Sequence, residues 1–350
     1  MPVRSSRMIS IEHHIPLAPY TTFGVSAFAD SFCRVTSVAE IRELVAQGWF
    51  TKRFLILGGG SNLLFLGDFH GLVVRNELLG QRVVHETEEN IVIEVGSGVN
   101  WHSFVMQCID HDRGGVENLS LIPGTMGAAP MQNIGAYGVE VKEVIEEVKG
   151  IDLSTGREVT FTNKECQFSY RESVFKNACK EKFFISSVTL RLTKKNHVLR
   201  THYGAIQNIL DQQKITSPTL RHVSDAVIYI RSSKLPDPKQ IGNAGSFFKN
   251  PSITVAQFEQ LRERYPEIPS YPSENQLIKV PAGWLIEQCG WKGKRVGRAG
   301  VHHQQALVLV NHGQATGAEL FSLAKEIQRD VREKFSIDIA AEVNIIESAS

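Results

Sequence analysis

Ser246 lies in the middle of the stretch GNAGSFFKNP, residues 242–251. A serine that acts as a nucleophile needs a base beside it and usually occupies a Gly-x-Ser-x-Gly turn between a strand and a helix. Phe247 and Phe248 follow Ser246, so this turn is absent. The local sequence by itself favours a hydroxyl that satisfies the backbone groups of a loop, and only the rest of the chain can favour a chemical role.

Arg171 and Glu342 are also not distinguished by their local sequence. Arg171 follows a tyrosine and precedes an acid in QFSYRESVF, where an arginine ordinarily forms a surface ion pair with Glu172. Glu342 stands in AEVNII, a strand-like run in which a single glutamate usually faces solvent.

Two glycine-rich stretches offer backbone to a ligand. In LILGGGSNLLF, residues 55–65, Gly58, Gly59 and Gly60 follow an apolar strand, an arrangement that brings bare N–H groups to a phosphate. The stretch lacks the Gly-Lys-Ser/Thr of a P-loop and the spacing of a dinucleotide fingerprint, so alone it is more typical of a tight turn. The second, LSLIPGTMGAAPMQNIGAYGVEV at 119–141, contains four glycines and exposes backbone over a long surface.

The paired histidines His302 and His303 do not indicate a metal site. Adjacent residues in a strand-like run point to opposite sides, and no cysteine or carboxylate is spaced to complete a set of ligands. We expect no metal, and we expect Phe247 and Phe248 to pack in the core.

Charge and cysteine usage limit the class of protein. The chain has 350 residues, with 38 Lys and Arg against 37 Asp and Glu, so no overall field attracts nucleic acid or an anionic membrane. Its five cysteines are scattered without a Cys-x-x-Cys, and no apolar run has the length of a signal peptide or membrane span. We expect reduced thiols, a cytoplasmic location, a monomer, and small-molecule substrates rather than nucleic acid or membrane as partners.

Strand-like and helical patterns are mixed along the whole chain, which predicts an α+β protein. A segment rich in proline and glycine, residues 231–246, predicts a crossing between domains. The expected strands are 32–36, 53–57, 71–76, 81–86, 90–98, 183–192, 306–311 and 341–346, with a hairpin at 148–161. The expected helices are 38–48, one from about Trp101, 253–265, 284–290 and 318–335.

Seven motifs in a fixed order give the chain a family resemblance. They are LGGGSNLLF, IPGTMGAAPMQNIGAYG, YRES, GNAGSFFKNP, PAGWLIEQCGWKG, HQQALVLVN and AEVNII. From about Tyr20 to Ile346 the chain resembles the UDP-N-acetylenolpyruvoylglucosamine reductases, flavoenzymes of bacterial cell-wall synthesis. The segment YGAIQ from Tyr203, followed by SSKLPDP, resembles the subclass with an extra tyrosine loop.

The resemblance implies a reaction and three catalytic residues. NADPH would reduce a non-covalently bound FAD, and the flavin would pass hydride to the enolpyruvyl ether of a UDP-sugar, giving UDP-N-acetylmuramate. Hydride arriving at C3 places negative charge on C2 and its carboxylate, which must be stabilised and then protonated. Ser246 resembles the proton donor, which needs no nucleophile's base, with Lys234 and Lys249 as candidates to assist it. Arg171 resembles the guanidinium that grips the two-oxygen anion, and Glu342 the carboxylic acid at the substrate carboxylate.

The same resemblance implies binding residues and domains. The residues implied for FAD are Gly58, Gly59, Gly60, Ser61, Asn62, Pro123, Gly124, Gly127, Gln132, Asn133, Gly135, Ala136, Tyr137 and Gly138. Those implied for the substrate are Tyr203, Lys234, Asn250 and Gln305. The implied fold is an FAD-binding fold of the vanillyl-alcohol-oxidase type with two α/β subdomains, plus a C-terminal α/β substrate-binding domain. The expected boundaries are 1–70, joined by a returning strand at 337–350, then 71–235 and 236–336.

Three positions depart from the family pattern. Thr21, Ala341 and Asn344 stand where the family usually has Asn, Pro and Arg. Two other functions also remain open on the sequence: an FAD oxidase that uses oxygen on a sugar, and a catalytically silent protein that binds FAD or a nucleotide. A meeting of Arg171, Ser246 and Glu342 at the reactive face of the flavin would favour the reductase over the oxidase. The silent protein would retain flavin without substrate-driven flavin oxidation.

Overall fold

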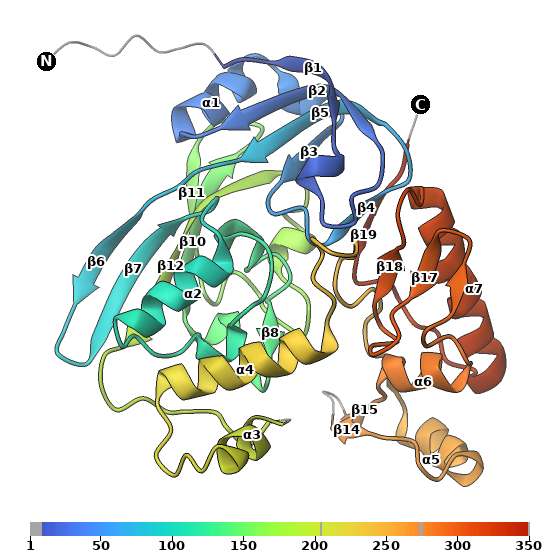
Figure 1. The fold of residues 1–350 in the computed structure, drawn as a ribbon. Coiled ribbons are helices and arrows are strands. Elements are labelled where there is room, and N and C mark those ends of the chain that lie inside the picture. Colours follow the sequence, from blue (N-terminus) through green and yellow to red (C-terminus); the bar gives the residue numbers. More distant parts are fainter. Residues whose placement is uncertain (1–8, 204, 273–275, 349–350) are drawn as a thin grey trace, which may run out of the picture. The chain divides into compact units, whose positions relative to one another are not determined.

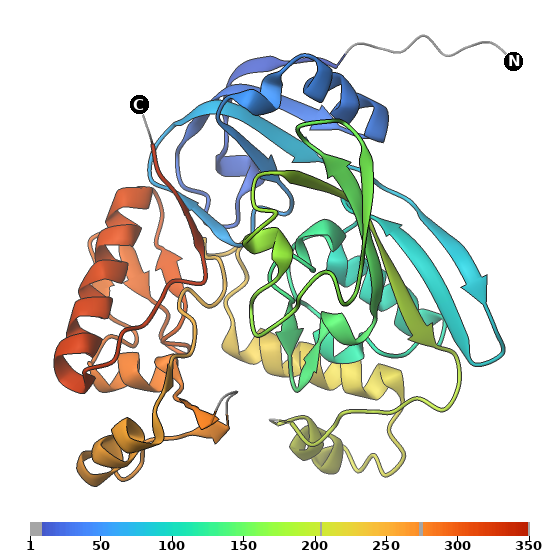
Figure 2. The ribbon, with the colours of Figure 1, turned by 180° about the vertical axis from the view of Figure 1, so that it is seen from behind.

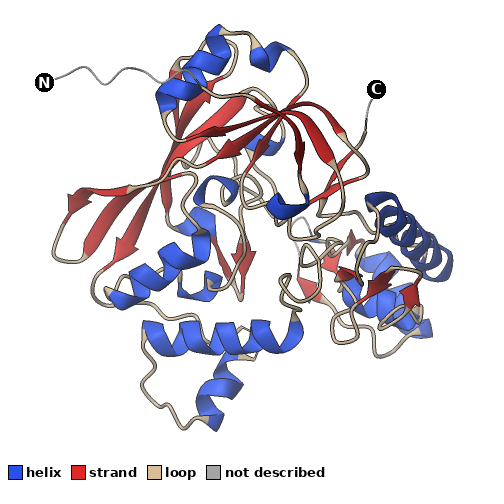
Figure 3. Ribbon diagram, turned by 45° about the horizontal axis from the view of Figure 1, so that its top comes forward, coloured by secondary structure: helices blue, strands red, loops and turns tan. Residues whose placement is uncertain are grey.

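The computed structural model describes residues 9–203, 205–272 and 276–348, which form two compact units. Unit 1 contains the residues up to 15, 29–59 and 70–231, and unit 2 contains 16–28, 60–69 and the residues from 232 onward. Each unit mixes helices and strands, as Figure 3 shows. None of the described helices is both long enough and apolar enough to cross a bilayer.

Unit 1 is built on an antiparallel sheet with the strand order β11-β10-β12-β7-β6 (Figure 1). Its strands are β6 (Gln81–Glu86), β7 (Asn90–Gly96), β10 (Ile145–Asp152), β11 (Glu158–Thr162) and β12 (Phe183–Thr193). The central strand β12 is buried along most of its length, whereas all six residues of the edge strand β6 are exposed. The hairpin of β10 and β11 confirms the one expected at 148–161.

A second sheet of unit 1 has the order β1-β2-β5-β3, with β3 and β5 parallel (Figure 2). Its strands are β1 (Glu12–Pro16), β2 (Phe28–Val35), β3 (Phe54–Leu57) and β5 (Phe69–Asn76), and a short pair is formed by β8 (Gly135–Ala136) and β9 (Val139–Glu140). Helix α1 (Val38–Ala46) begins at a capping box of Ser37 and Glu40. Its expected pattern of apolar residues is confirmed by Ile41 and Leu44, which are fully buried against this sheet's core.

Helices α2 (Trp101–Asp110), α3 (Ile206–Gln212) and α4 (Leu220–Lys234) complete unit 1. Trp101 and Phe104 of α2 pack with Ile93 of β7 and Val188 of β12 in the larger core. The segment expected to cross between domains from residue 231 begins where unit 1 ends, at Arg231, although helix α4 itself continues to Lys234. Its apolar residues recur at helical spacing up to Ile230, and this periodicity outweighs the prolines that follow.

The described part of unit 2 contains three small sheets and three α-helices. The sheets are β13-β15-β14, β16-β17-β18 and the parallel pair β19-β4. The strands are β4 (Leu63–Phe65), β13 (Ser252–Ile253), β14 (Tyr271–Pro272), β15 (Ile278–Lys279), β16 (Arg295–Val296), β17 (Ala299–Val301), β18 (Leu309–Asn311) and β19 (Asn344–Ile346). The helices are α5 (Val255–Arg264), α6 (Ala282–Gln288) and α7 (Gly317–Phe335). Helix α7 has a capping box of Thr316 and Glu319 and buries the apolar face expected from the sequence.

The remaining helical turns are short 3-10 helices. They are η1 (Ala18–Tyr20), η2 (Trp49–Thr51), η3 (Glu117–Leu119), η4 (Met126–Ala128), η5 (Val141–Glu143) and η6 (Val174–Lys176). Turns η3, η4 and η5 lie within or beside the second glycine-rich stretch, so that stretch folds as compact turns.

Candidate active site

The two glycine loops of unit 1 pack backbone against backbone. A Cβ atom on Gly59 would lie 2.7 Å from the Cα atom of Gly124, and one on Gly58 would lie 2.7 Å from Oγ1 of Thr125. The guanidinium of Arg75 donates a hydrogen bond to the carbonyl of Gly58. Gly58 and Gly59 are therefore required by the close approach of the two loops.

We expect Gly59→Ala to lower the free energy of unfolding by about 1–3 kcal/mol, because the new methyl group would meet backbone that cannot rotate away. Gly283→Ala is the matched control. Its Cβ atom would have ordinary contacts, the closest at 3.4 Å, inside helix α6, where alanine is favoured. Urea unfolding of both variants measures the difference, and equal stabilities would contradict the close-approach explanation.

The second loop is held against the segment before helix α2. Gly127 donates its N–H to the carbonyl of Ser97 at 2.8 Å, and a Cβ atom there would lie 2.6 Å from the Cβ atom of Ser97. Pro123 is exposed, whereas Thr125 is buried and its Oγ1 has no hydrogen-bond partner within the described chain. A buried, unsatisfied hydroxyl beside two closely packed glycine loops is the feature expected where a polar ligand completes the structure.

Asn133 fixes the turn that follows. This fully buried residue donates from Nδ2 to the Glu140 carboxylate at 2.9 Å and to the carbonyl of Ser169 at 3.1 Å. Its Oδ1 accepts from the N–H of Lys142 at 3.1 Å. Asn133 thus ties the turn at 133–142 to the loop that carries Arg171, and it acts by positioning these segments.

Arg171 is held in a strained backbone conformation. Its φ angle is 57°, and Asn133 and Tyr137 also have positive φ angles, of 43° and 50°. Such conformations cost of order 1–3 kcal/mol each and cluster at functional sites. The Nη2 atom of Arg171 donates to the carbonyl of Gly135 at 2.9 Å, while the neighbouring acid Glu172 pairs with Lys176 at 3.6 Å.

The other residues expected around this turn lie close by within unit 1. Ala136 is in β8, Gln132 directly precedes Asn133, and a Cβ atom on Gly138 would lie 3.2 Å from the Cβ atom of Tyr203. Tyr203 is 54% exposed, so its ring is available to a ligand. Gly204, which belongs to the YGAIQ segment, lies outside the described residues.

Unit 2 brings Ser246 and Glu342 to the same piece of backbone. Ser246 forms a β-bridge with Val308, and Phe247 donates its N–H to Leu307 at 2.7 Å. On the other side, the N–H of Glu342 donates to the carbonyl of Phe247 at 2.8 Å. Glu342 is half-buried and lies opposite the residue that follows Ser246.

The loop at Gly60, Ser61 and Asn62 is attached to the same strand. Asn62 donates from Nδ2 to the carbonyl of Glu342 at 3.4 Å. Its own carbonyl accepts from the N–H of Asn344 at 3.1 Å and from the Asn344 side chain at 2.9 Å. Two of the expected catalytic residues and part of the expected cofactor loop therefore meet within unit 2.

Asn250 and Gln305 meet at the start of helix α6. Asn250 accepts from the N–H of Ala282 at 3.0 Å, and Oε1 of Gln305 would lie 3.4 Å from a Cβ atom on Gly283. Lys234 is exposed at the end of α4, and Lys249 continues the Ser246 strand by donating its N–H to the carbonyl of Ala340 at 2.9 Å.

The departures from the family pattern have local explanations. Oγ1 of Thr21 accepts from the N–H of Gly24 at 3.3 Å, a turn that an asparagine side chain would form in the same way. Ala341 forms a β-bridge with Phe248, and Asn344 holds the Asn62 loop as described above.

The expectation that His302 and His303 point to opposite sides is wrong. Their ring centroids are 4.4 Å apart, because the strand ends at Val301 and residues 303–304 form a bend. Burial and the neighbouring His303 lower the pKa of His302. Phe247 and Phe248 are both buried, as expected, and their rings pack edge to face.

Arg231 is a polar residue that was not among the site residues expected from the sequence. It lies on the apolar side of α4, four residues after the buried Val227, and its Nε atom is buried without a hydrogen-bond partner in the described chain. The signal available in the sequence was an arginine in register with buried helix positions.

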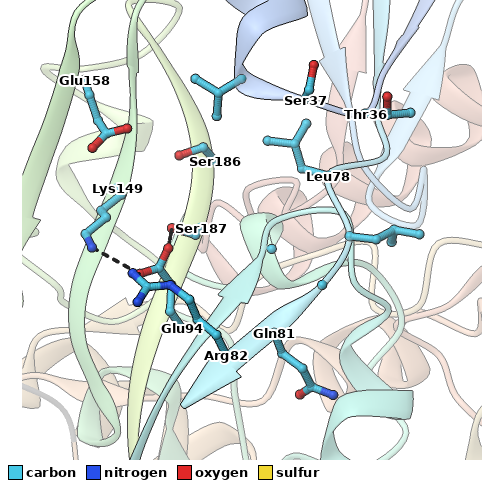
Figure 4. Close-up of a pocket in the computed structure, with 14 residues that line it drawn as sticks. Thr36, Ser37, Leu78, Gln81, Arg82, Glu94, Lys149, Glu158, Ser186 and Ser187 are labelled. Carbon is cyan, nitrogen blue, oxygen red and sulfur yellow. Dashed lines mark hydrogen bonds and ion pairs between the residues drawn. The ribbon is translucent and has the colours of Figure 1, made fainter. Parts of the chain in front are cut away.

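A separate hollow in unit 1 is lined by polar residues between α1 and the five-stranded sheet (Figure 4). Lys149 and Ser187 both bond to Glu94 there, at 3.1 Å each. Arg82, Lys149 and Glu94 are already paired with one another, and the residues expected to bind FAD or substrate do not line this hollow.

Comparison with known proteins decides the family. Residues 237–346 match the family described as UDP-N-acetylenolpyruvoylglucosamine reductase, C-terminal domain, and residues 29–162 match the FAD binding domain family. A UDP-N-acetylenolpyruvoylglucosamine reductase from Flavobacterium johnsoniae is 49% identical over 338 residues, 97% of this chain and 100% of that protein. The chain belongs to the UDP-N-acetylenolpyruvoylglucosamine reductase family. The resemblance seen in its motifs is thereby confirmed.

Further UDP-N-acetylenolpyruvoylglucosamine reductases agree with this assignment. The protein from Amoebophilus asiaticus is 48% identical over 340 residues, 97% of this chain and 100% of its own length. The crystal structure of the enzyme from Thermus caldophilus covers 97% of this chain and 100% of its own, with a TM-score of 0.68 at 22% identity, which shows a shared fold. The reductase fold is thus α+β, with an FAD-binding domain followed by the C-terminal domain of the family.

Proposed function

We propose that the protein reduces UDP-N-acetylglucosamine enolpyruvate to UDP-N-acetylmuramate, a precursor of peptidoglycan, with NADPH as reductant and non-covalent FAD as cofactor. Support comes from near full-length similarity to UDP-N-acetylenolpyruvoylglucosamine reductases and from the matched FAD-binding domain. The single observation that best supports this reaction is the network of hydrogen bonds to the backbone in unit 2. It joins Phe247, beside the proton donor Ser246, to Glu342, and Glu342 to Asn62.

The residues present fit a flavin dinucleotide. The unsatisfied Oγ1 of Thr125 lies where Gly58 and Gly59 approach the second glycine loop closely, and a polar group of the cofactor would satisfy it. When bound, FAD would take hydride from NADPH and deliver it to the enolpyruvyl carbon.

The protein's own residues stabilise the charge that develops on the substrate and supply a proton. The planar guanidinium of Arg171, oriented by its bond to Gly135, binds the two carboxylate oxygens as charge accumulates on them. Glu342 donates a hydrogen bond to the same carboxylate, and Ser246 gives its proton to C2. Tyr203, Lys234, Asn250 and Gln305 bind the UDP-sugar.

The proposal also includes the cellular location, the oligomeric state and the partners of the protein. The protein acts in the cytoplasm as a monomer on small molecules, without nucleic acid or membrane as partner. Residues 236–336 bind the substrate. The segments 1–70 and 71–235, with the returning strand 337–350, bind FAD.

We expect one non-covalent FAD per chain, because the loops offer backbone and the unsatisfied hydroxyl of Thr125, and no sequence motif indicates an attachment residue. The purified protein should be yellow, and acid precipitation should release the flavin into the supernatant. Flavin that stays in the pellet would contradict the non-covalent cofactor. A colourless protein that takes up no FAD would contradict the proposed function.

A further inference from the structure

Asn118 is a buried residue of turn η3 whose side chain holds two separate segments of unit 1. Its Nδ2 atom donates to the carbonyl of Tyr137 at 3.0 Å and to the carbonyl of Arg200 at 2.8 Å. The amide nitrogen of asparagine carries two hydrogens, so these two bonds use both of its donors. Oδ1 of Asn118 is buried without a hydrogen-bond partner in the described chain. The amide orientation is fixed by its partners, since the opposite orientation would place the oxygen against two carbonyls.

The turn that carries Asn118 is itself fixed to the surrounding core. The Glu117 carboxylate accepts a hydrogen bond from the N–H of Gly115 at 2.7 Å, and the indole Nε1 of Trp101 donates to the carbonyl of Leu119 at 2.9 Å. Asn118 therefore starts from a rigid base. This is required of a side chain that sets the position of other groups.

The two carbonyls bound by Asn118 belong to the segments that support Tyr203. Arg200 comes three residues before Tyr203 in the chain. Tyr137 directly precedes Gly138, and a Cβ atom on Gly138 would lie 3.2 Å from Cβ and 3.3 Å from Cγ of Tyr203. The base of the Tyr203 side chain thus lies against the turn at 137–138, and Asn118 joins this turn to the chain that leads to Tyr203.

The chain that follows Tyr203 is anchored near the same turn. Tyr137 packs against the apolar cluster of helices α3 and α4, which contains the buried Ile206. Both ends of the segment from Arg200 to Ile206 are therefore tied to Tyr137, one through Asn118 and the other through this cluster. The ring of Tyr203 is exposed between these two anchors.

We propose that Asn118 is a positioning residue for UDP-sugar binding, which holds the base of the Tyr203 loop against the turn at 137–138. This inference rests on the proposed function, in which Tyr203 contacts the UDP-sugar. A loop whose base is fixed loses less conformational freedom when a ligand binds, so the ligand is bound more tightly. Because Asn118 acts through Tyr203, its removal should weaken substrate binding only while the tyrosine ring is present.

The test uses the full-length holoenzyme and two variants of Asn118. N118L removes both donors at nearly the same volume, and N118D keeps the shape of the side chain while replacing the donor nitrogen with oxygen. N163L and N163D are the matched controls. Nδ2 of Asn163 also donates to two backbone carbonyls, those of Lys142 at 2.8 Å and Ile145 at 2.7 Å, and neither belongs to the Tyr203 loop.

Isothermal titration calorimetry of the oxidised holoenzyme with the enolpyruvyl substrate measures the dissociation constant, because no turnover occurs without NADPH. We expect N118L and N118D to raise this constant about 10-fold, the effect of losing two ordinary hydrogen bonds. N163L and N163D should bind the substrate as the wild type does. Wild-type substrate affinity in both Asn118 variants would overturn the proposal.

A double-mutant cycle with Y203A tests whether Asn118 acts through the tyrosine. In the Y203A background, N118L should cause no further loss of substrate affinity, because the ring that Asn118 positions is gone. The FAD dissociation constant of N118L should change much less than that of the substrate. Additive losses in the double variant, or an equal loss of FAD affinity in N118L, would assign Asn118 to folding or to the flavin turn and overturn the proposal.

Hydrogen–deuterium exchange of the substrate-free holoenzyme follows the loop without any substrate. Peptides that contain Tyr203 should exchange faster in N118L than in the wild type, and at the wild-type rate in N163L, because only Asn118 anchors this segment. Unchanged exchange in N118L would overturn the proposal and leave the proposed function intact. The proposed function fails instead if the wild-type holoenzyme does not bind the enolpyruvyl substrate, and the exchange result is independent of that outcome.

Discussion

Replacing Ser246 with alanine is expected to leave FAD binding and flavin reduction by NADPH nearly intact while turnover falls by about 10⁴-fold. A well-placed general acid contributes about 10²- to 10⁴-fold in rate, and the upper end applies where no water can take its place. Neither FAD binding nor flavin reduction needs the serine proton. The bridge to Val308 is made by the backbone, so alanine should keep the strand in place.

Stopped-flow absorbance under anaerobic conditions measures this effect directly. The reduced variant is mixed with the enolpyruvyl substrate, and flavin reoxidation is followed together with product formation. Ser246→Cys should retain more activity than alanine, because a thiol is a stronger acid of similar volume. Reoxidation and product formation at the wild-type rate in the alanine variant would show that Ser246 is an ordinary loop hydroxyl.

Arg171→Lys and Glu342→Gln should each slow the reaction of reduced enzyme with substrate by at least about 10²-fold, with little effect on flavin reduction. Lysine loses the planar fork that binds two oxygens, and glutamine loses the acid proton. Arg171→Lys would also lose the bond from Nη2 to Gly135, which helps to set the position of the side chain.

The two half-reactions are measured separately, first with NADPH alone and then with substrate alone. Arg82→Lys and Glu333→Gln are matched controls, because both residues form ion pairs at the surface, where such pairs contribute little. Equal losses in both half-reactions would assign Arg171 or Glu342 to flavin placement or folding.

Long helices and strands could be predicted from the sequence, because the spacing of their apolar residues indicates which face is buried. Helix α7 and strand β12 follow their expected ranges closely. A two-residue strand such as β13 could not be predicted, because it exists only through pairing with a distant segment. Helix α4 was not among the predicted helices, although its apolar residues recur at helical spacing.

In the candidate site, too, local sequence identifies single residues but not the contacts between them. Motifs identified Ser246, Glu342 and Asn62 separately, but hydrogen bonds between remote backbone segments bring them together, and local sequence does not report these. Arg231 could not be recognised because the absence of a partner is a property of tertiary structure. The histidine rings at 302 and 303 were misjudged because a bend removes the alternation of a strand.

The edge strand β6 bears on how the protein avoids aggregation. An unpaired edge is a template for intermolecular pairing, above all when it is flat and apolar. Here the pairing of β6 with β7 is irregular between Val83 and His85, which disturbs the flat edge. Charged side chains also bridge from β6 to neighbouring elements, from Arg82 to Glu94 at 2.7 Å and from Glu86 to Lys194 at 2.6 Å. A second molecule docking there would have to break these pairs, so the exposed strand is protected at the high concentrations reached during expression.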